Sequence, residues 1–292
     1  MNFLDVFTEK LIFPEGPVAL KDGSWLCVQG GTSGCVTHIS SDGKTHRVIA
    51  VTGAPNGLAF DKDGFIWVAE TKVPALLKIS MGGDVEVALT SCGDEAFLYP
   101  NDLCFGPDGY LYLTDSGILT NDFEPTGKVR DDYNELRYDG RVYRIHPKTK
   151  EIIKIDSGIR YTNGIAFGPD GFLYVNETLT GDIFRYRVQK GIIGKREVFG
   201  NVIHPGAGPG FKGPDGMAFG EDGLLYVTVY GQGDVTVLND KGQVVGRIKT
   251  RGMNPTNVAF ALSPKKKIYV TEYQFGTIEV FDVRTDGLGL WT

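Results

Sequence analysis

The stretch NGLAFDKDGFIWVAE, residues 56–70, decides the fold of this chain because its pattern recurs along the sequence. The other copies are EGPVALKDGSWLCV from Glu15, NDLCFGPDGYLYLTD from Asn101, NGIAFGPDGFLYVNE from Asn163, DGMAFGEDGLLYVTV from Asp215 and a degenerate TNVAFALSPKKKIYVTE from Thr256. Successive copies start 41, 45, 62, 52 and 41 residues apart. A period of this length is typical of β-propellers, in which each repeat forms a four-stranded blade.

The repeated phrase itself predicts two strands and the turn between them. In the second copy, the short apolar segment 58–60 is expected to be the innermost strand and 65–68 the second strand. The turn Asp63-Gly64 joins them, because glycine accepts the positive φ that such a turn needs. Equivalent turns are Asp22-Gly23, Asp108-Gly109, Asp170-Gly171 and Asp222-Gly223, with Pro264-Lys265 in the sixth copy. We interpret the aspartates of these turns as structural.

The full pattern predicts an all-β fold, a six-bladed β-propeller. Two further strand-like runs follow each phrase, for example 75–80 and 85–90, except that the sixth repeat has only the run 277–283. Residues 3–11 precede the first repeat, and we expect them to supply the missing outer strand of the last blade. That N-terminal strand would close the ring and remove two exposed sheet edges. Because no break in composition occurs, we expect residues 1–292 to form a single propeller domain.

Composition narrows the classes of function. The 40 glycines among 292 residues are nearly twice the usual share of about 7% and fit many tight turns. The net charge of −6 and the lack of a long basic run argue against nucleic-acid binding. No segment has the roughly 18 to 20 apolar residues of a membrane span, and residues 1–11 lack the apolar core of a signal peptide. We therefore expect no membrane partner and a cytoplasmic location.

Two features leave alternatives open. Cys27 and Cys35 fall on neighbouring predicted strands, so a disulfide is conceivable, although buried reduced thiols are favoured for all four cysteines without a secretion signal. The charged insertion at 117–140 makes the third repeat the longest. Such a long loop is either functional or a solvated excursion of the surface.

The first residue of each phrase opens an innermost strand, and innermost strands surround the axis of a propeller. Equivalent first residues should therefore form a ring at one mouth of the central channel: Glu15, Asn56, Asn101, Asn163, Asp215 and Thr256. Two carboxylates that converge in a confined channel are costly unless a cation neutralises them. Ordinary turn formation explains Asn-Gly and Asp-Gly pairs, but it explains Glu15 poorly.

The ring therefore predicts one divalent metal ion. Hard carboxylate and amide oxygens suit Ca²⁺, with Mg²⁺ or Mn²⁺ as alternatives. Zn²⁺ fits less well because no histidine falls on the ring. We treat Asn56 and Thr256 as residues that line the channel on the substrate side rather than as metal ligands.

Four motifs, PEGPV around Glu15, PNDL around Asn101, TNGIAF around Asn163 and PDGMAF around Asp215, give the chain a family resemblance. It resembles, over nearly its whole length, the gluconolactonase, regucalcin and luciferin-regenerating enzyme family of six-bladed propellers. Diisopropyl fluorophosphatase and the paraoxonases are related metal-binding propellers. The resemblance implies one catalytic metal held by these four residues. It also implies that Asp102 and Tyr99 lie beside the metal.

From the ring and this resemblance we expect hydrolysis of a lactone or another small ester. Asp215 is the expected base, or a nucleophile as in some relatives, and Glu15 is mainly a ligand. Tyr99 stands where sugar-lactone hydrolases of the family often carry an arginine, which favours a flatter or less polar substrate. The alternatives are hydrolysis of a phosphotriester or phosphorus–fluorine bond on the same metal, and a non-catalytic calcium-binding propeller.

Overall fold

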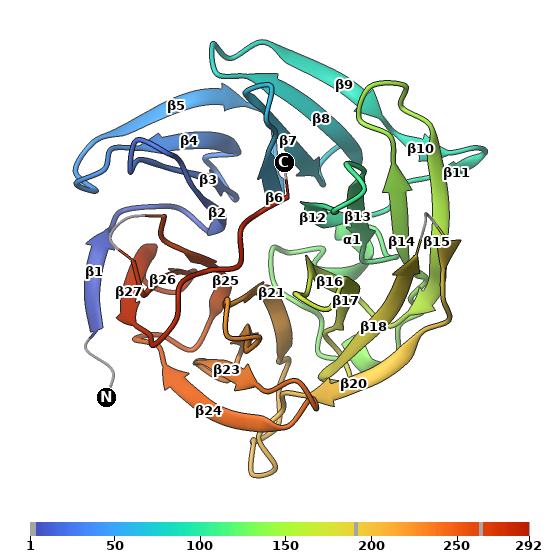
Figure 1. Ribbon diagram of the computed structural model, residues 1–292. Coiled ribbons are helices and arrows are strands. Elements are labelled where there is room, and N and C mark those ends of the chain that lie inside the picture. Colours follow the sequence, from blue (N-terminus) through green and yellow to red (C-terminus); the bar gives the residue numbers. More distant parts are fainter. Residues whose placement is uncertain (1–3, 190–191, 263–264, 292) are drawn as a thin grey trace.

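The computed structural model describes residues 4–189, 192–262 and 265–291, in which six sheets stand like blades around one axis (Figure 1). The predicted all-β, six-bladed propeller is thus confirmed. The helical parts of the described chain are α1 (Thr120–Phe123) and the 3₁₀ turn η1 (Tyr133–Glu135). No helix in the described ranges is long and apolar enough to cross a membrane.

The first three blades follow the chain from the innermost to the outermost strand. Blade 1 contains β2 (Pro14–Ala19), β3 (Trp25–Gln29), β4 (Cys35–Ile39) and β5 (His46–Val51). Blade 2 contains β6 (Pro55–Phe60), β7 (Phe65–Glu70), β8 (Ala75–Ser80) and β9 (Val85–Leu89), followed by the small hairpin β10 (Ser91–Cys92) and β11 (Glu95–Ala96). Blade 3 contains β12 (Pro100–Phe105), β13 (Leu111–Asp115), β14 (Gly140–Ile145) and β15 (Ile152–Ile159).

The remaining three blades repeat this order. Blade 4 contains β16 (Thr162–Phe167), β17 (Phe172–Glu177), β18 (Asp182–Gln189) and β20 (Glu197–Asn201), with β19 (Ile192–Ile193) paired to β18. Blade 5 contains β21 (Gly213–Phe219), β22 (Leu225–Tyr230), β23 (Asp234–Leu238) and β24 (Val244–Lys249). Blade 6 contains β25 (Pro255–Phe260), β26 (Lys267–Glu272), β27 (Thr277–Asp282) and β1 (Leu4–Thr8).

The N-terminal segment lies where the sequence predicted it, as the fourth strand of blade 6. Strand β1 pairs antiparallel with β27, for instance Asp5 with Val280. Phe3, which the prediction included in this strand, lies outside the described residues. The chain thus contributes its first and last strands to one sheet, which leaves β27 with a hydrogen-bonded neighbour on both sides.

The hairpin turns that follow the inner strands have the predicted chemistry. Gly23, Gly64, Gly109, Gly171 and Gly223 all have φ between +74° and +85°. Four of the turn aspartates, Asp22, Asp108, Asp170 and Asp222, accept a hydrogen bond from the main-chain N–H two residues on, as when Asp170 accepts from Phe172 at 3.1 Å. In blade 2, Asp61 rather than Asp63 accepts from the N–H of Phe65. These aspartates are structural, as expected. In the sixth copy, Pro264 lies outside the described residues.

Packing between neighbouring blades forms the apolar core. Leu26 and Val28 of blade 1, for example, share a buried cluster with Ile66 and Val68 of blade 2. Equivalent clusters fill the other junctions, so the blades form a rigid frame around the axis. All four cysteines are free, and Cys27 pairs with Thr37 rather than with Cys35 across β3 and β4.

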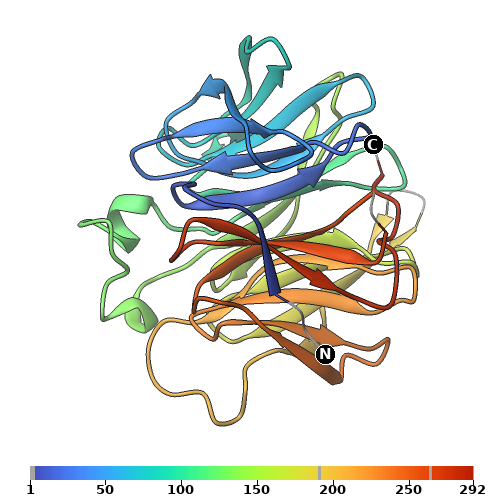
Figure 2. The same cartoon turned by 90° about the vertical axis from the view of Figure 1, so that its left-hand side faces the viewer.

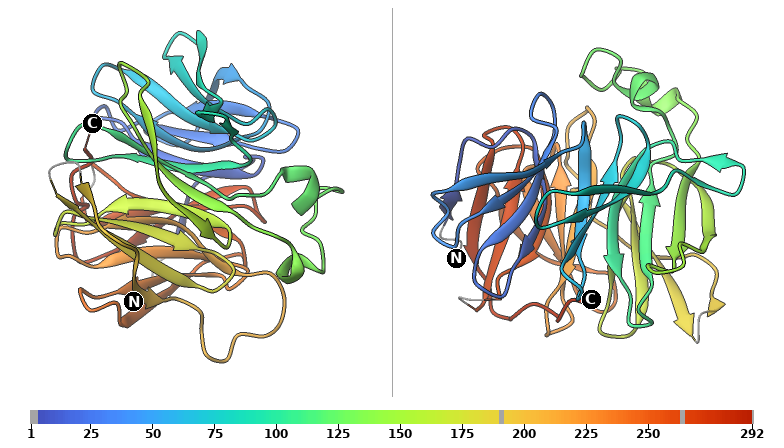
Figure 3. Two further views of the ribbon diagram at one scale, coloured as in Figure 1. Left: turned by 90° about the vertical axis from the view of Figure 1, so that its right-hand side faces the viewer. Right: turned by 90° about the horizontal axis from the view of Figure 1, so that it is seen from above.

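The two mouths of the central channel differ. We call the near mouth the end at which the inner strands begin, and the far mouth the end at which they finish. The insertion that carries α1 and η1 projects from one face of the propeller, whereas the C-terminal segment lies on the opposite face (Figures 2 and 3). Phe123 of α1 packs against Tyr161, just before β16, so the insertion lies beside the near mouth.

Candidate metal centre

Each inner strand has an irregular register just after its first residues. The hydrogen-bonded pairing with the second strand shifts between Glu15 and Val18 in β2, and a shift follows the first residues of the other five inner strands as well. Irregularities of this kind often re-aim side chains beside functional sites. They occur here at the register of the predicted ring, which consists of Glu15, Asn56, Asn101, Asn163, Asp215 and Thr256.

Three carboxylates influence one another at this level of the channel: Glu15, Asp102 and Asp215. Burial raises the pKa of Glu15 well above its usual range, and repulsion from Asp215 and Asp102 raises it further. Burial and then repulsion from Asp102 raise the pKa of Asp215 in the same way. Burial raises the pKa of Asp102 to about 7. The site therefore concentrates negative charge where water is scarce, which a divalent cation would relieve.

No lysine or arginine relieves this charge within the part of the chain that the structure describes. The ion pairs there lie elsewhere, for example Arg144 with Asp108 at a hairpin turn. The described residues also contain no group of three or more His, Cys, Asp or Glu side chains arranged to hold a metal ion by themselves. A metal centre at the near mouth would therefore have to combine carboxylates with neutral oxygen donors.

Two hydroxyl groups orient the amides that could provide those donors. The Ser116 hydroxyl donates to a main-chain carbonyl of blade 4 at 2.8 Å, and the Thr178 hydroxyl donates to one of blade 5 at 2.9 Å. Because each hydroxyl has one proton, it can only accept from the neighbouring amide. Asn101 Nδ2 donates to Ser116 at 3.0 Å, and Asn163 Nδ2 donates to Thr178 at 3.2 Å. Both amide oxygens are thereby turned away from the hydroxyls and left free to bind a ligand.

This donor set fits Ca²⁺. Glu15 and Asp215 supply charged oxygens, and Asn101 and Asn163 supply neutral ones, all of them hard donors of the kind calcium prefers. Asn101 and Asn163 are buried, whereas Glu15 and Asp215 remain partly accessible. The set can therefore hold an ion on the protein side while solvent or a substrate reaches the other side.

The other two members of the ring have different surroundings. The Thr256 hydroxyl is 2.7 Å from the Pro14 carbonyl oxygen, to which it donates, and 2.7 Å from the Thr271 hydroxyl. It therefore joins the walls of blades 6 and 1. Asn56 Nδ2 donates to the Asn101 carbonyl oxygen at 3.3 Å, and its side chain is half-buried. The structure thus places Thr256 in the wall and leaves Asn56 beside the carboxylates.

Sequence reasoning missed Asn257. The residue after each ring position is glycine in four repeats (Gly16, Gly57, Gly164 and Gly216) but Asp102 in the third repeat and Asn257 in the sixth. Asn257 Nδ2 donates to Glu15 Oε2 at 3.1 Å. Its Oδ1 accepts from the Val258 N–H at 2.8 Å, which fixes the amide orientation. The departure from a repeated glycine was the signal in the sequence that could have identified this residue.

The glycines at this register make room for Asp102 and Asn257. A Cβ on Gly57 would lie 2.6 Å from Asp102 Oδ1, and a Cβ on Gly216 would lie 2.0 Å from Asn257 Cγ. Both polar side chains are more than nine-tenths buried. Asp102 also accepts a hydrogen bond from the Leu103 N–H at 2.8 Å. Asp102 and Asn257 therefore lie one step deeper in the channel than the ring.

Aromatic rings flank the near mouth. Tyr99 and Tyr161 lie two residues before Asn101 and Asn163, and their ring centroids are 6.0 Å apart. Phe123 and Phe211 extend the cluster, with Phe123 4.7 Å from Tyr161 and 5.5 Å from Phe211. Tyr161 has a φ of +67°, an unusual value for a bulky residue, which the surrounding cluster maintains. Aromatic rings therefore dominate this side of the near mouth.

Comparison with known proteins identifies the group to which this architecture belongs. The family model described as the SMP-30/Gluconolactonase/LRE-like region matches residues 13–274, which include all six ring positions. The chain belongs to this family.

Two relatives illustrate the range of the family. A gluconolactonase of Zymomonas mobilis is 26% identical over 265 residues, which are 84% of this chain and 72% of the relative. A diisopropyl-fluorophosphatase of Loligo vulgaris is 28% identical over 305 residues, which are 96% of this chain and 92% of the relative. These relatives support a lactone hydrolase or a related hydrolase.

Two solved structures share the fold. A gluconolactonase from Xanthomonas campestris has a TM-score of 0.79 at 23% identity, covering 97% of this chain and 90% of its own. Regucalcin from Agrobacterium tumefaciens, a calcium-binding protein, has a TM-score of 0.74 at 19% identity, covering 97% of this chain and 98% of its own. At these identities the likeness concerns the fold.

Proposed function

We propose that this chain hydrolyses a lactone at a divalent metal, most suitably Ca²⁺, held at the near mouth of the channel. The observation that carries the proposal is the cluster of buried Asp102 with the partly accessible Glu15 and Asp215, for which no lysine or arginine of the described chain provides a counter-charge. The oriented amides of Asn101 and Asn163 complete a set of hard oxygen donors beside it. Gluconolactonase and calcium-binding proteins among the relatives and structural neighbours support the same assignment.

Glu15, Asn101, Asn163 and Asp215 would hold the ion. When bound, it would supply positive charge that polarises the lactone carbonyl and stabilises the oxyanion that forms there. Asn257 holds one oxygen of Glu15, so the other oxygen, Oε1, is left for the ion. Ser116 and Thr178 keep the amide oxygens on the ion side.

Asp215 moves the proton in this proposal. It accepts one proton from water as the water oxygen forms a bond to the lactone carbonyl carbon. It returns that proton to the ring oxygen as the ester C–O bond breaks, which gives the hydroxy acid. Burial and repulsion from Asp102 raise the pKa of Asp215 above that of an exposed carboxyl group, which makes its carboxylate a stronger base.

The aromatic rings at the near mouth favour lactones with a flat or apolar body. Tyr99 is buried between Tyr161 and Glu124, and its hydroxyl lies 3.5 Å from Glu124 Oε1. A polyhydroxylated sugar lactone would need several hydrogen-bond partners on this wall, which Tyr161, Phe123 and Phe211 supply poorly. We therefore place apolar lactones before gluconolactone as substrates.

A phosphorus–fluorine bond or a phosphotriester is the second candidate substrate. The observation that favours it is the fluorophosphatase relative, which aligns over 96% of this chain at 28% identity. The same donors and the same base would serve attack at phosphorus as well as at carbon.

The test is proton release from sugar-derived and apolar lactones and from a phosphotriester, with metal-stripped protein to which calcium, manganese, magnesium or zinc is restored. We expect turnover only after metal is added, with apolar lactones fastest. Faster hydrolysis of the phosphotriester would select the second candidate. Tight calcium binding without turnover of any compound would contradict hydrolysis and leave a calcium-binding propeller.

A further inference from the structure

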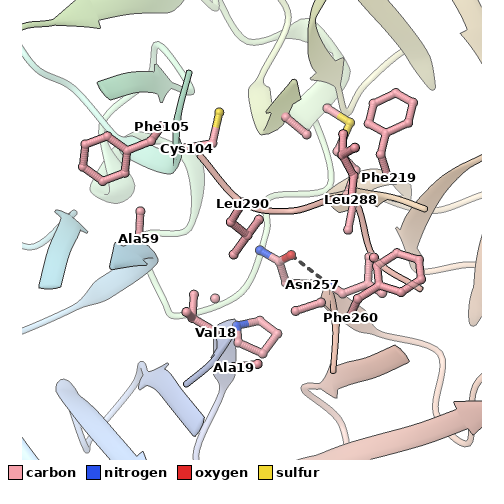
Figure 4. Close-up of a pocket in the computed structure, with 18 of the residues that line it drawn as sticks. Val18, Ala19, Ala59, Cys104, Phe105, Phe219, Asn257, Phe260, Leu288 and Leu290 are labelled. Carbon is pink, nitrogen blue, oxygen red and sulfur yellow. Dashed lines mark hydrogen bonds between the residues drawn. The ribbon is translucent and has the colours of Figure 1, made fainter. Parts of the chain in front are cut away.

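The far half of the channel contains a cavity of about 170 Å³ that the four proposed metal ligands do not line (Figure 4). All six inner strands line it, from the register of Asp102 and Asn257 to the ends of the strands. The ring residues Glu15, Asn101, Asn163 and Asp215 are not part of its wall. Cavities much larger than a water molecule are rare in protein interiors, so the presence of this one requires an explanation.

The repeat itself keeps this space open. At one register of the inner strands, all six repeats carry a small side chain that lines the cavity: Ala19, Ala59, Cys104, Ala166, Ala218 and Ala259. A larger residue follows each of them, and in five repeats that residue is phenylalanine. A packing defect would occur at one place in one blade. A small residue at the same register in six repeats is instead a property of the fold.

The C-terminal segment 287–291 covers the far mouth. Leu288 N–H donates to the Phe219 carbonyl oxygen at 2.8 Å, and isolated bridges join Gly287 to Gly220 and Trp291 to Phe105. The segment therefore runs from blade 5 to blade 3 across the opening, as Figures 1 and 4 show. Leu290 is 67% exposed and Trp291 is 43% exposed, so this cover is a thin layer.

The lining defines the kind of molecule that fits. Aliphatic and aromatic side chains form the wall, and its described residues include no lysine, arginine or histidine. Asp102 provides the single carboxyl group of the wall, and one of its oxygens accepts the Leu103 N–H at 2.8 Å. A carboxyl oxygen keeps lone pairs that can accept from a neutral hydroxyl group, and the wall offers an anion no cationic side chain.

We propose that this cavity is a second ligand chamber, which binds a small uncharged molecule with an apolar body and one hydroxyl group directed at Asp102. Its volume corresponds to a molecule of about the size of benzene or phenol, because an apolar cavity of about 150 Å³ is known to take up benzene. The ligand enters when the segment 287–291 lifts from the far mouth. This inference does not depend on the proposed hydrolysis.

Phenol is the probe, and benzoate is its charged counterpart of similar shape. Isothermal titration of the full chain is expected to give saturable phenol binding with a dissociation constant of about 1 mM or below, and no binding of benzoate. Ala166→Leu and Ala218→Leu put larger side chains into the cavity from blades 4 and 5 and should each weaken phenol binding at least about ten-fold. Ala96→Leu, at an exposed position outside the cavity, should leave it unchanged.

If Ala166→Leu and Ala218→Leu fold poorly, crystals of the unaltered chain under xenon pressure test whether the cavity takes up an apolar atom. Xenon density between the six inner strands, at the register of the six small residues, is the expected result. Absence of both phenol binding and xenon density would overturn the proposal. Equal binding of phenol and benzoate, or phenol binding unaffected in folded Ala166→Leu and Ala218→Leu, would overturn it as well, because the ligand would then bind elsewhere.

Discussion

The side-chain amide of Asn257 donates a hydrogen bond to Glu15 Oε2 at 3.1 Å and thereby joins the last blade to the first near the mouth at which the inner strands begin. The two residues are 242 positions apart in the chain. Val258 holds the opposite end of the amide, so the donor cannot turn away without the loss of a second hydrogen bond. Asn257 is thus a positioning residue for Glu15, one of the two carboxylates proposed to hold calcium.

Replacing Asn257 by glycine, the residue of four other repeats, should weaken calcium binding about ten-fold, as removal of an outer partner of a metal ligand commonly does. Folding should persist, since glycine is compatible with this register elsewhere in the propeller. Calorimetric titration of the metal-stripped protein measures the affinity. Asn254→Gly is the matched control, because Asn254 lies three residues earlier and its side chain forms no hydrogen bond with Glu15 or Asp215 within the described residues. Equal losses in both variants would contradict a specific role for Asn257.

The hydroxyls of Ser116 and Thr178 should matter for calcium affinity although neither is proposed to touch the ion. Thr178→Val removes the acceptor of the Asn163 amide, which then can rotate its oxygen away from the ion. We expect about a ten-fold loss of calcium affinity in this variant. Thr178→Ser retains the hydroxyl and should restore the affinity. If the valine and serine variants bind calcium equally well, the amide is oriented by other contacts.

Tyr99 should determine which lactones are accepted. Tyr99→Arg brings charged donors to the near mouth, so the ratio of kcat/KM for a sugar lactone to that for an apolar lactone should rise about ten-fold or more, the scale expected from satisfied hydrogen bonds. Tyr99→Phe keeps the ring and should leave the ratio nearly unchanged. Steady-state kinetics on one lactone of each kind provide the measurement. If Tyr99→Arg leaves this ratio unaltered, the aromatic wall does not determine which lactones are preferred.

Glu279 should make the fold less stable as the pH rises. It is fully buried on β27, and burial raises its pKa from 4.5 to about 7. Because the folded protein holds this proton more tightly than the unfolded chain does, stability is greatest below about pH 4.5 and falls as the pH rises to about 7. The expected contribution is on the order of 2 kcal/mol.

Glu279→Gln should remove this part of the pH dependence. The amide stays neutral, so the variant should be more stable than the unaltered chain at pH 8 and nearly equal to it at pH 4.5. Thermal or urea unfolding at both pH values, without added metal, measures the difference. A variant that is less stable at pH 8 would show that the carboxylate is favourably solvated there.

The sequence predicted the six blades because each repeat encodes a local unit: an apolar inner strand, an aspartate–glycine turn and a second strand. It also predicted which residues open the inner strands. It could not predict that the Thr256 hydroxyl would be bound within the wall, because its contact with Pro14 joins the sixth repeat to the first. The roles of Asn257, Ser116 and Thr178 also depend on contacts between blades: Asn257 binds Glu15 of blade 1, and the two hydroxyls donate to carbonyl oxygens of the next blade. Spacing along the chain does not reveal such contacts.

The most direct test of the metal-dependent account is a calcium titration of metal-stripped protein in which binding and hydrolysis of an apolar lactone are followed together. We expect one calcium ion per chain and a rise in rate that follows its occupancy. We also expect that Asp215→Asn, which keeps an oxygen ligand but loses the base, binds calcium more weakly and loses turnover by about 100-fold or more even when saturated. Full turnover without calcium, or full activity in calcium-saturated Asp215→Asn, would contradict it.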